Sequence, residues 1–137
     1  MNDRILNKLS ETKDSVKLVE ENFPETYDKF LEMSRLERDG IYKNIEFSIQ
    51  NILDICAIIM KEENLKVPES DESMLNELGK AGVIDKDIIE KIQGMKGFRN
   101  LLVHRYGPIN DEIAYTYIKE GLDDFQDIFE EIKKVIS

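Results

Sequence analysis

The spacing of the apolar residues constrains the fold more than any other feature, because they recur every three or four positions over long stretches. Such a repeat places one apolar face along an α-helix, and it predicts amphipathic helices that bury this face. The chain of 137 residues has only three prolines and seven glycines, so few positions interrupt the helical pattern. The periodicity therefore predicts an all-α protein built from long helices.

Five helices are expected from the apolar stripes and from the capping residues at their ends. Pro24 ends or redirects the first helix, and Ser34 opens a Ser-x-x-Glu capping box before the second. Gly82 fits a C-terminal cap, and Asp85 and Asn110 fit the N-caps of the last two helices. The pattern predicts an antiparallel four-helix bundle with an extra short helix, in one domain over residues 1–137. The expected helices cover about residues 3–22, 34–62, 71–80, 85–106 and 110–136.

Composition excludes several classes of protein. The net charge of −10 argues against a protein that coats nucleic acid. Cys56 is the only cysteine and His104 the only histidine, which excludes an internal disulfide and a Cys/His zinc site within one chain. The most apolar run, residues 52–60, has less than half of the ~20 residues that span a bilayer, and the first residues do not resemble a signal peptide. We expect a cytoplasmic protein without membrane contact.

The sign of the charge reverses in residues 91–110. This window contains Lys91, Lys96, Arg99 and Arg105 and no acidic residue, whereas residues 1–90 carry −9 and residues 111–137 carry −5. A positive island attracts a phosphodiester while the remaining surface repels extended nucleic acid. The alternative is that these bases balance acidic side chains of neighbouring helices, and charge alone leaves both interpretations open.

The same window holds residues suited to phosphodiester chemistry. Arg99 offers a permanent planar charge for phosphate oxygens, and His104 can donate or accept a proton near neutral pH. On an ideal helix Arg99 shares a face with Tyr106, and Asn100 lies one turn before His104. Arg99 and His104 are about 140° apart on that helix, so either the helix distorts or a second copy completes the site. A packed histidine without a catalytic role is the alternative.

The segment 99–106, RNLLVHRY, resembles the R-x4-H-x-Y motif of the HEPN superfamily, and more narrowly that of HepT-like toxins. The order of the predicted helices is similar over most of the chain. The resemblance implies an endoribonuclease toxin that needs no metal or other cofactor and acts as a homodimer, with both motifs in one cleft. It also implies RNA as the substrate and a cognate minimal nucleotidyltransferase (MNT) as the antitoxin.

Residue by residue, the resemblance makes Arg99 and His104 the catalytic pair and Asn100 their polar support. It makes Tyr106 the residue that the nucleotidyltransferase adenylylates, which silences the toxin. RNA cleavage without a metal needs both a base and an acid, and one histidine cannot readily supply both proton transfers. A dimer with two copies of His104 in one cleft supplies the missing group.

Three further residues have both a functional and a structural interpretation. Asp54 interrupts an apolar run and is either a buried acid that orients Arg99 or His104, or a solvated residue beside the stripe. Lys96 and Arg105 either contact RNA phosphates or are simply solvated.

Gly94 and Gly97 stand inside an expected helix, where each costs ~1 kcal/mol relative to alanine. A close approach by another backbone explains them, either in a dimer or inside the bundle. Cys56 has aliphatic neighbours and is expected to be a buried apolar residue.

Two other functions remain as alternatives to the nuclease. The chain is then either a non-catalytic helical partner of a nucleotidyltransferase, which binds a nucleotide or substrate through the basic window, or an inactive structural dimer. A complete Arg/His/Tyr motif favours the enzyme, because phosphate binding alone does not require a histidine at this spacing.

Overall fold

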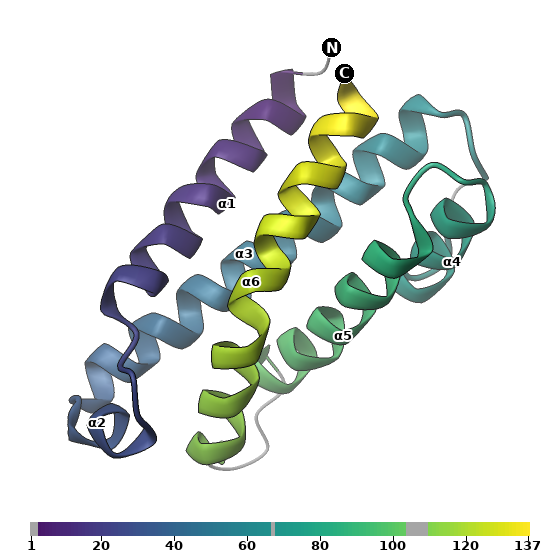
Figure 1. The fold of residues 1–137 in the computed structure, drawn as a ribbon. Helices are drawn as coiled ribbons and strands as arrows, with labels where there is room; N and C mark the ends of the chain where they lie inside the picture. The colour runs from purple at the N-terminus through teal and green to yellow at the C-terminus, as the bar shows by residue number, and fades with distance from the viewer. Residues whose placement is uncertain (1–2, 67, 104–109) are drawn as a thin grey trace.

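A computed structural model describes residues 3–66, 68–103 and 110–137, and these residues form six α-helices. The helices are α1 (Asp3–Asn22), α2 (Tyr27–Glu32), α3 (Arg35–Glu62), α4 (Asp71–Lys80), α5 (Lys86–Val103) and α6 (Asp111–Ile136). Helices α1, α3, α5 and α6 form an antiparallel bundle, in which α1 begins and α6 ends at the same end (Figure 1). The short α4 packs against α3 and α5, and α2 packs against α6. The predicted all-α bundle is confirmed.

The apolar stripes predicted from the sequence form the core of this bundle. The side chain of Thr12, the one polar member of the α1 stripe, is buried and donates a hydrogen bond to the carbonyl of Lys8 at 2.6 Å. Each fully buried aliphatic side chain contributes about 1.5–3 kcal/mol through the apolar surface that it removes from water. The buried stripe residues are Ile5, Leu9, Val16 and Val19 of α1, and Ile41, Ile45, Ile49, Ile52, Cys56 and Ile59 of α3.

The helices begin at the capping residues that the sequence indicates. The Ser34 hydroxyl accepts a hydrogen bond from the Glu37 backbone N–H at 3.1 Å, and the Glu37 carboxylate accepts one from the Ser34 N–H at 3.0 Å. The bond from the Ser34 N–H is the main cause of a lowered pKa of Glu37, because it stabilises the charged carboxylate. At the start of α6, Asn110 accepts hydrogen bonds from the backbone N–H groups of Glu112 and Ile113.

Helix α2 was not predicted, and the structure corrects the expected number of helices. It has only six residues, too few to show a periodic pattern, and tertiary contacts hold it in place. Phe30 is fully buried between Tyr42 and Tyr115, whose ring centroids lie 6.1 and 5.3 Å away. The Thr26 side chain caps the helix by accepting a hydrogen bond from the Lys29 N–H.

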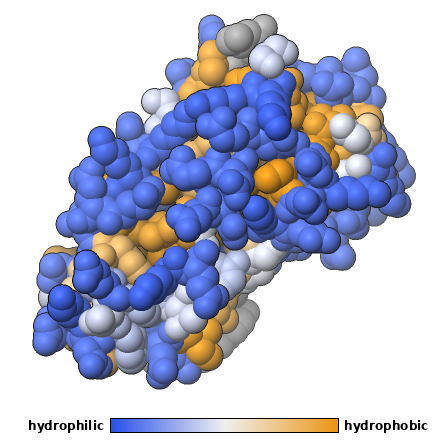
Figure 2. Space-filling view, in the orientation of Figure 1, coloured by the Kyte–Doolittle hydropathy of each residue, from blue (hydrophilic) through white to orange (hydrophobic). Residues whose placement is uncertain are grey.

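The surface seen in the orientation of Figure 1 is largely hydrophilic, with hydrophobic patches between the helices (Figure 2). In the part of the chain that the structure describes, no helix combines the length and the apolar character needed to cross a membrane.

Removing the capping box destabilises the bundle. Ser34→Ala lowers the free energy of unfolding by about 1 kcal/mol, because the first turn of α3 loses its side-chain acceptor. Urea denaturation measures this change. Ser10→Ala, at an exposed position inside α1, is the matched control, and equal losses in the two variants would contradict the role of the cap.

Candidate functional site

Arg99 lies near the end of α5 and pairs with a carboxylate from another helix. Its Nη2 donates to Oδ2 of Asp71, the first residue of α4, at 3.0 Å. The Arg99 side chain is only 16% exposed and that of Asp71 is 43% exposed. Among the described residues, the Nε of Arg99 is buried and has no hydrogen-bond partner. The guanidinium is thus largely removed from water and held by one contact.

The local sequence explains why Asp71 stands beside Arg99. Ser70 caps α4 by accepting a hydrogen bond from the Ser73 N–H, which sets where this helix begins. Three α4 residues are buried in the core and dock the helix against α3 and α5, namely Met74, Leu75 and Leu78. On α5, Arg99 follows Phe98, which is 5% exposed, so it emerges at the border of the core.

Cys56 of α3 is buried near the same junction. Burial raises the pKa of its thiol to about 12, and the Asp71 carboxylate adds a smaller effect in the same direction. The prediction of a buried apolar cysteine is confirmed, because the residue is fully buried in the hydrophobic core.

Asp54 does not supply the carboxylate that Arg99 contacts. Its Oδ1 accepts a hydrogen bond from Gln50 at 2.9 Å, and its Oδ2 pairs with Lys8 of α1 at 3.4 Å. Its side chain is 40% exposed. Of the two interpretations of Asp54, its exposure and its contacts agree with a solvated residue beside the stripe, and His104 lies outside the described residues. The carboxylate that contacts Arg99 is that of Asp71, which sequence reasoning missed because 28 residues separate it from Arg99.

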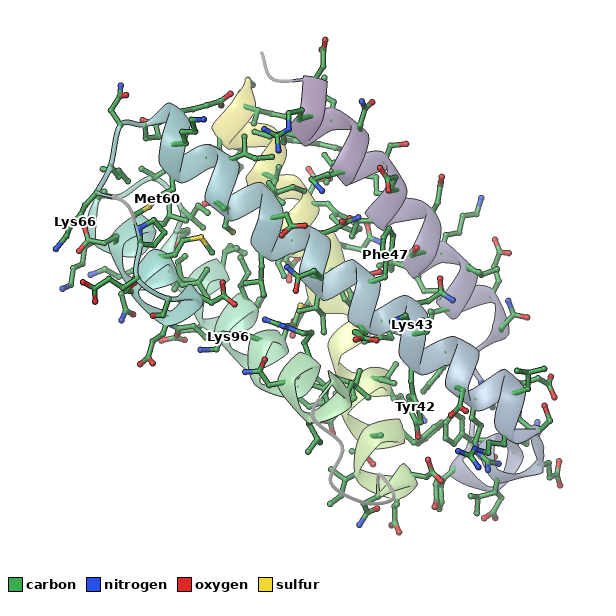
Figure 3. All side chains as sticks on the ribbon, turned by 180° about the vertical axis from the view of Figure 1, so that it is seen from behind. Tyr42, Lys43, Phe47, Met60, Lys66 and Lys96 are labelled. Carbon is green, nitrogen blue, oxygen red and sulfur yellow. The ribbon has the colours of Figure 1, made fainter. Side chains whose placement is uncertain are left out.

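The structure also resolves part of the basic window. Lys91 bonds to Asp127 of α6 at 2.7 Å and lies 3.8 Å from Asp124, and the bond to Asp127 raises the pKa of Lys91. Lys91 and Arg99 thus balance acidic side chains of neighbouring helices, as the alternative interpretation of the charge pattern has it. Lys96 forms no ion pair with the described residues, and it lies on the face of α5 seen from behind in Figure 3.

Two glycines and a leucine form an exposed strip on another face of α5. Gly94, Gly97 and Leu101 are all exposed, and Leu101 is 52% exposed. A Cβ on Gly97 would meet no atom within 4 Å, and one on Gly94 would meet only the Tyr117 hydroxyl at 3.4 Å. Packing inside the described bundle therefore does not explain the glycine at position 97.

His104, Arg105 and Tyr106 lie outside the described residues, so their predicted roles are not placed by the structure. The helices on either side of this segment are anchored to other parts of the fold. Arg99 bonds to Asp71 before it, and beyond it the Tyr42 hydroxyl of α3 donates a hydrogen bond to Asp111. Figure 3 labels Tyr42 beside the start of α6. Burial, together with this bond, raises the pKa of Tyr42.

Tyr117 of α6 completes the packing beneath the glycine strip. Its ring stacks on Phe98 with centroids 4.2 Å apart, and burial raises the pKa of its hydroxyl to about 12.

Asn100 follows Arg99 and is partly buried. Among the described residues, no three His, Cys, Asp or Glu side chains are grouped to hold a metal ion.

Comparison with solved structures defines the class of fold. The tri-AMPylated HEPN toxin of Shewanella oneidensis, solved in complex with an MNT antitoxin, is similar with a TM-score of 0.86. The similarity covers 98% of this chain and 99% of that one, at 24% identity. The protein therefore shares its helical-bundle fold with that toxin.

Sequence comparison gives the family. The Ribonuclease HepT-like family matches residues 12–132, a range that includes the motif at 99–106. The mRNA nuclease HepT of Shewanella oneidensis is 26% identical over 133 residues, which cover 97% of this chain and 98% of that protein. A provisionally named RNase of Archaeoglobus fulgidus is 33% identical over 85 residues. These residues cover 62% of this chain and 64% of that protein, which is less than two thirds of its length. The chain belongs to the Ribonuclease HepT-like family, so the predicted family is confirmed, and the predicted enzyme is confirmed at the level of a ribonuclease.

The ion pair between Arg99 and Asp71 stabilises the fold. Asp71→Asn lowers the free energy of unfolding by about 1–3 kcal/mol, because a largely buried guanidinium loses its counter-charge. Glu72→Gln is the matched control, since it removes an exposed acid from the same first turn of α4. Thermal denaturation of the two variants tests the pair, and an equal loss in both would assign the effect to the helix end instead.

Proposed function

We propose that the protein is a metal-independent endoribonuclease toxin that acts as a homodimer and uses Arg99 and His104 of both protomers. The observation that carries the proposal is the complete R-x4-H-x-Y motif inside the region that the Ribonuclease HepT-like family matches. The similarity to an mRNA nuclease over nearly the full length of both chains supports RNA as the substrate.

The proposed reaction is a transfer within the RNA backbone. The 2′-oxygen attacks the adjacent phosphorus while one His104 takes its proton, and the bond from phosphorus to the 5′-oxygen breaks as the other His104 protonates that oxygen. The products are a 2′,3′-cyclic phosphate and a free 5′-hydroxyl. Arg99 stabilises the negative charge that develops on the phosphate oxygens in the transition state.

The exposed strip on α5 is the proposed contact between the protomers. Each helical glycine costs ~1 kcal/mol relative to alanine, and Gly97 has no neighbour in its own described bundle that requires the missing side chain. A second α5 that approaches closely at Gly94 and Gly97, with Leu101 packed at its edge, offsets this cost. The contact brings together the α5 helices of the two protomers, each of which carries the start of the motif near its end.

Adenylylation of Tyr106 by an MNT-type antitoxin is the proposed means of silencing. An attached AMP adds a negative phosphodiester and a bulky nucleoside to the motif, where it competes with RNA for Arg99. The similar HEPN toxin of Shewanella oneidensis is described as tri-AMPylated and bound to its MNT antitoxin, which supports this partner.

Four other residues have proposed supporting roles. Asn100 supports the catalytic pair from its partly buried position, and Lys96 and Arg105 contact RNA phosphates next to the scissile one. Asp54 supports the site indirectly, because its contacts with Gln50 and Lys8 join α3 to α1.

Cleavage tests the proposal directly. The purified protein is expected to cut RNA in the presence of EDTA and to leave a 2′,3′-cyclic phosphate that mass spectrometry identifies. His104→Ala abolishes cutting because the acid and the base are both lost. Lys17→Ala, an exposed position in α1, is the control and keeps full activity. Equal cleavage by His104→Ala and wild type would refute the proposal, and RNA binding without cleavage would favour the non-catalytic partner.

The dimer contact is tested by two glycine substitutions that the chain itself tolerates equally. A Cβ meets no atom within 4 Å at either Gly97 or Gly40. Gly97→Ala is expected to weaken the dimer at least tenfold, because the added methyl groups separate two closely packed helices. Gly40→Ala leaves the dimer unchanged. Sedimentation velocity measures both, and an unchanged dimer in Gly97→Ala would contradict the proposed contact.

A further inference from the structure

We propose that Asp71 is a positioning residue that orients the guanidinium of Arg99 for RNA cleavage. This inference rests on the proposed nuclease function and extends the site to α4, an element outside the motif and outside the four-helix bundle. The observation that carries it is the ion pair of 3.0 Å between Nη2 of Arg99 and Oδ2 of Asp71.

The burial of Arg99 makes this contact strong. Its side chain is only 16% exposed, so the attraction between the two charges is screened less than at an open surface. An arginine side chain otherwise samples many rotamers, and a planar guanidinium stabilises phosphate oxygens only in the correct orientation. The carboxylate therefore selects the orientation of Arg99 before RNA binds.

The contact leaves the arginine able to bind phosphate. A guanidinium has five N–H donors, and the ion pair commits one nitrogen, Nη2, to one carboxylate oxygen. The Nε–H is buried, so the donors that remain for a phosphate oxygen are those of Nη1 and the second N–H of Nη2. Asp71 thus fixes the guanidinium of Arg99 without using all of its hydrogen-bond donors.

The carboxylate itself stands on a rigid support. Asp71 is in the first turn of α4, where the helix dipole favours a negative charge. The Ser70 cap sets the start of the helix, and Met74, Leu75 and Leu78 bury its apolar face. A charge on such a helix is held more precisely than one on a loop.

The experiment compares Asp71→Asn, Asp71→Glu and Glu72→Gln with wild type in steady-state cleavage of an RNA oligonucleotide. Asp71→Asn is expected to lower kcat by about 10- to 100-fold, the loss typical of a misplaced catalytic group. KM stays the same or falls, because the substitution removes a negative charge near bound RNA. Asp71→Glu restores part of kcat because it restores the carboxylate, and Glu72→Gln behaves as wild type.

A second measurement separates positioning from a merely structural role. The Nε–Hε signal of Arg99 in a ¹⁵N NMR spectrum, assigned through its loss in Arg99→Lys, reports the order of the guanidinium. It is expected to broaden and to exchange faster with water in Asp71→Asn, and to be unchanged in Glu72→Gln.

Three outcomes decide the inference. A folded Asp71→Asn variant that cleaves RNA as fast as wild type, or faster, would overturn it, and faster cleavage would show that Asp71 restrains Arg99. A wild-type protein that cleaves no RNA would refute the proposed function instead. In that case the NMR signal alone decides whether Asp71 orders Arg99, and an unchanged signal in Asp71→Asn would overturn the inference.

Discussion

The burial of α3 is the constraint on which the rest of the structure depends. This helix of 28 residues packs against α1, α4 and α5, and it carries more buried residues than any other described helix. Helices α4 and α5 follow one another in the chain, and both pack against α3 as well as against each other. The ion pair between Asp71 and Arg99 forms where these two helices meet, so the candidate site is a product of the packing on α3.

Basic side chains that stand without acidic neighbours along the sequence are paired with acidic side chains in the fold. The window at residues 91–110 carries four basic side chains, which suggests an open positive patch. In the structure, Lys91 is balanced by Asp127 and Asp124, and Arg99 is balanced by Asp71. Among the described bases of this window only Lys96 forms no ion pair, so the unpaired positive charge is narrower than the sequence suggests. Such a site suits a few phosphates and not an extended polyanion.

The sequence predicts the helices well because their signals are local. The bounds 3–22 and 71–80 match α1 and α4, and the caps at Ser34 and Asn110 follow from side chains within three residues of the helix start. Helix α2 has no local signal, since burial of Phe30 among distant aromatic rings stabilises it. The partner of Arg99 was missed for the same reason, because no pattern on one helix reveals a carboxylate on another. Asp54 attracted attention by interrupting an apolar run, yet its contacts are with Lys8 and Gln50. The predicted roles of His104 and Tyr106 fall outside the described residues and stay predictions.

In the proposed mechanism, RNA cleavage needs a histidine from each of two protomers in one cleft. A subunit-mixing titration tests it most directly: a fixed amount of wild-type protein exchanges subunits with increasing amounts of His104→Ala, and RNA cleavage is measured after equilibration. If both histidines act in one cleft, every mixed dimer is impaired, and the activity of the fixed wild-type amount falls toward zero as the variant is added in excess. If each protomer cleaves RNA with its own histidine, the activity stays constant throughout the titration, and the account of a shared site is contradicted.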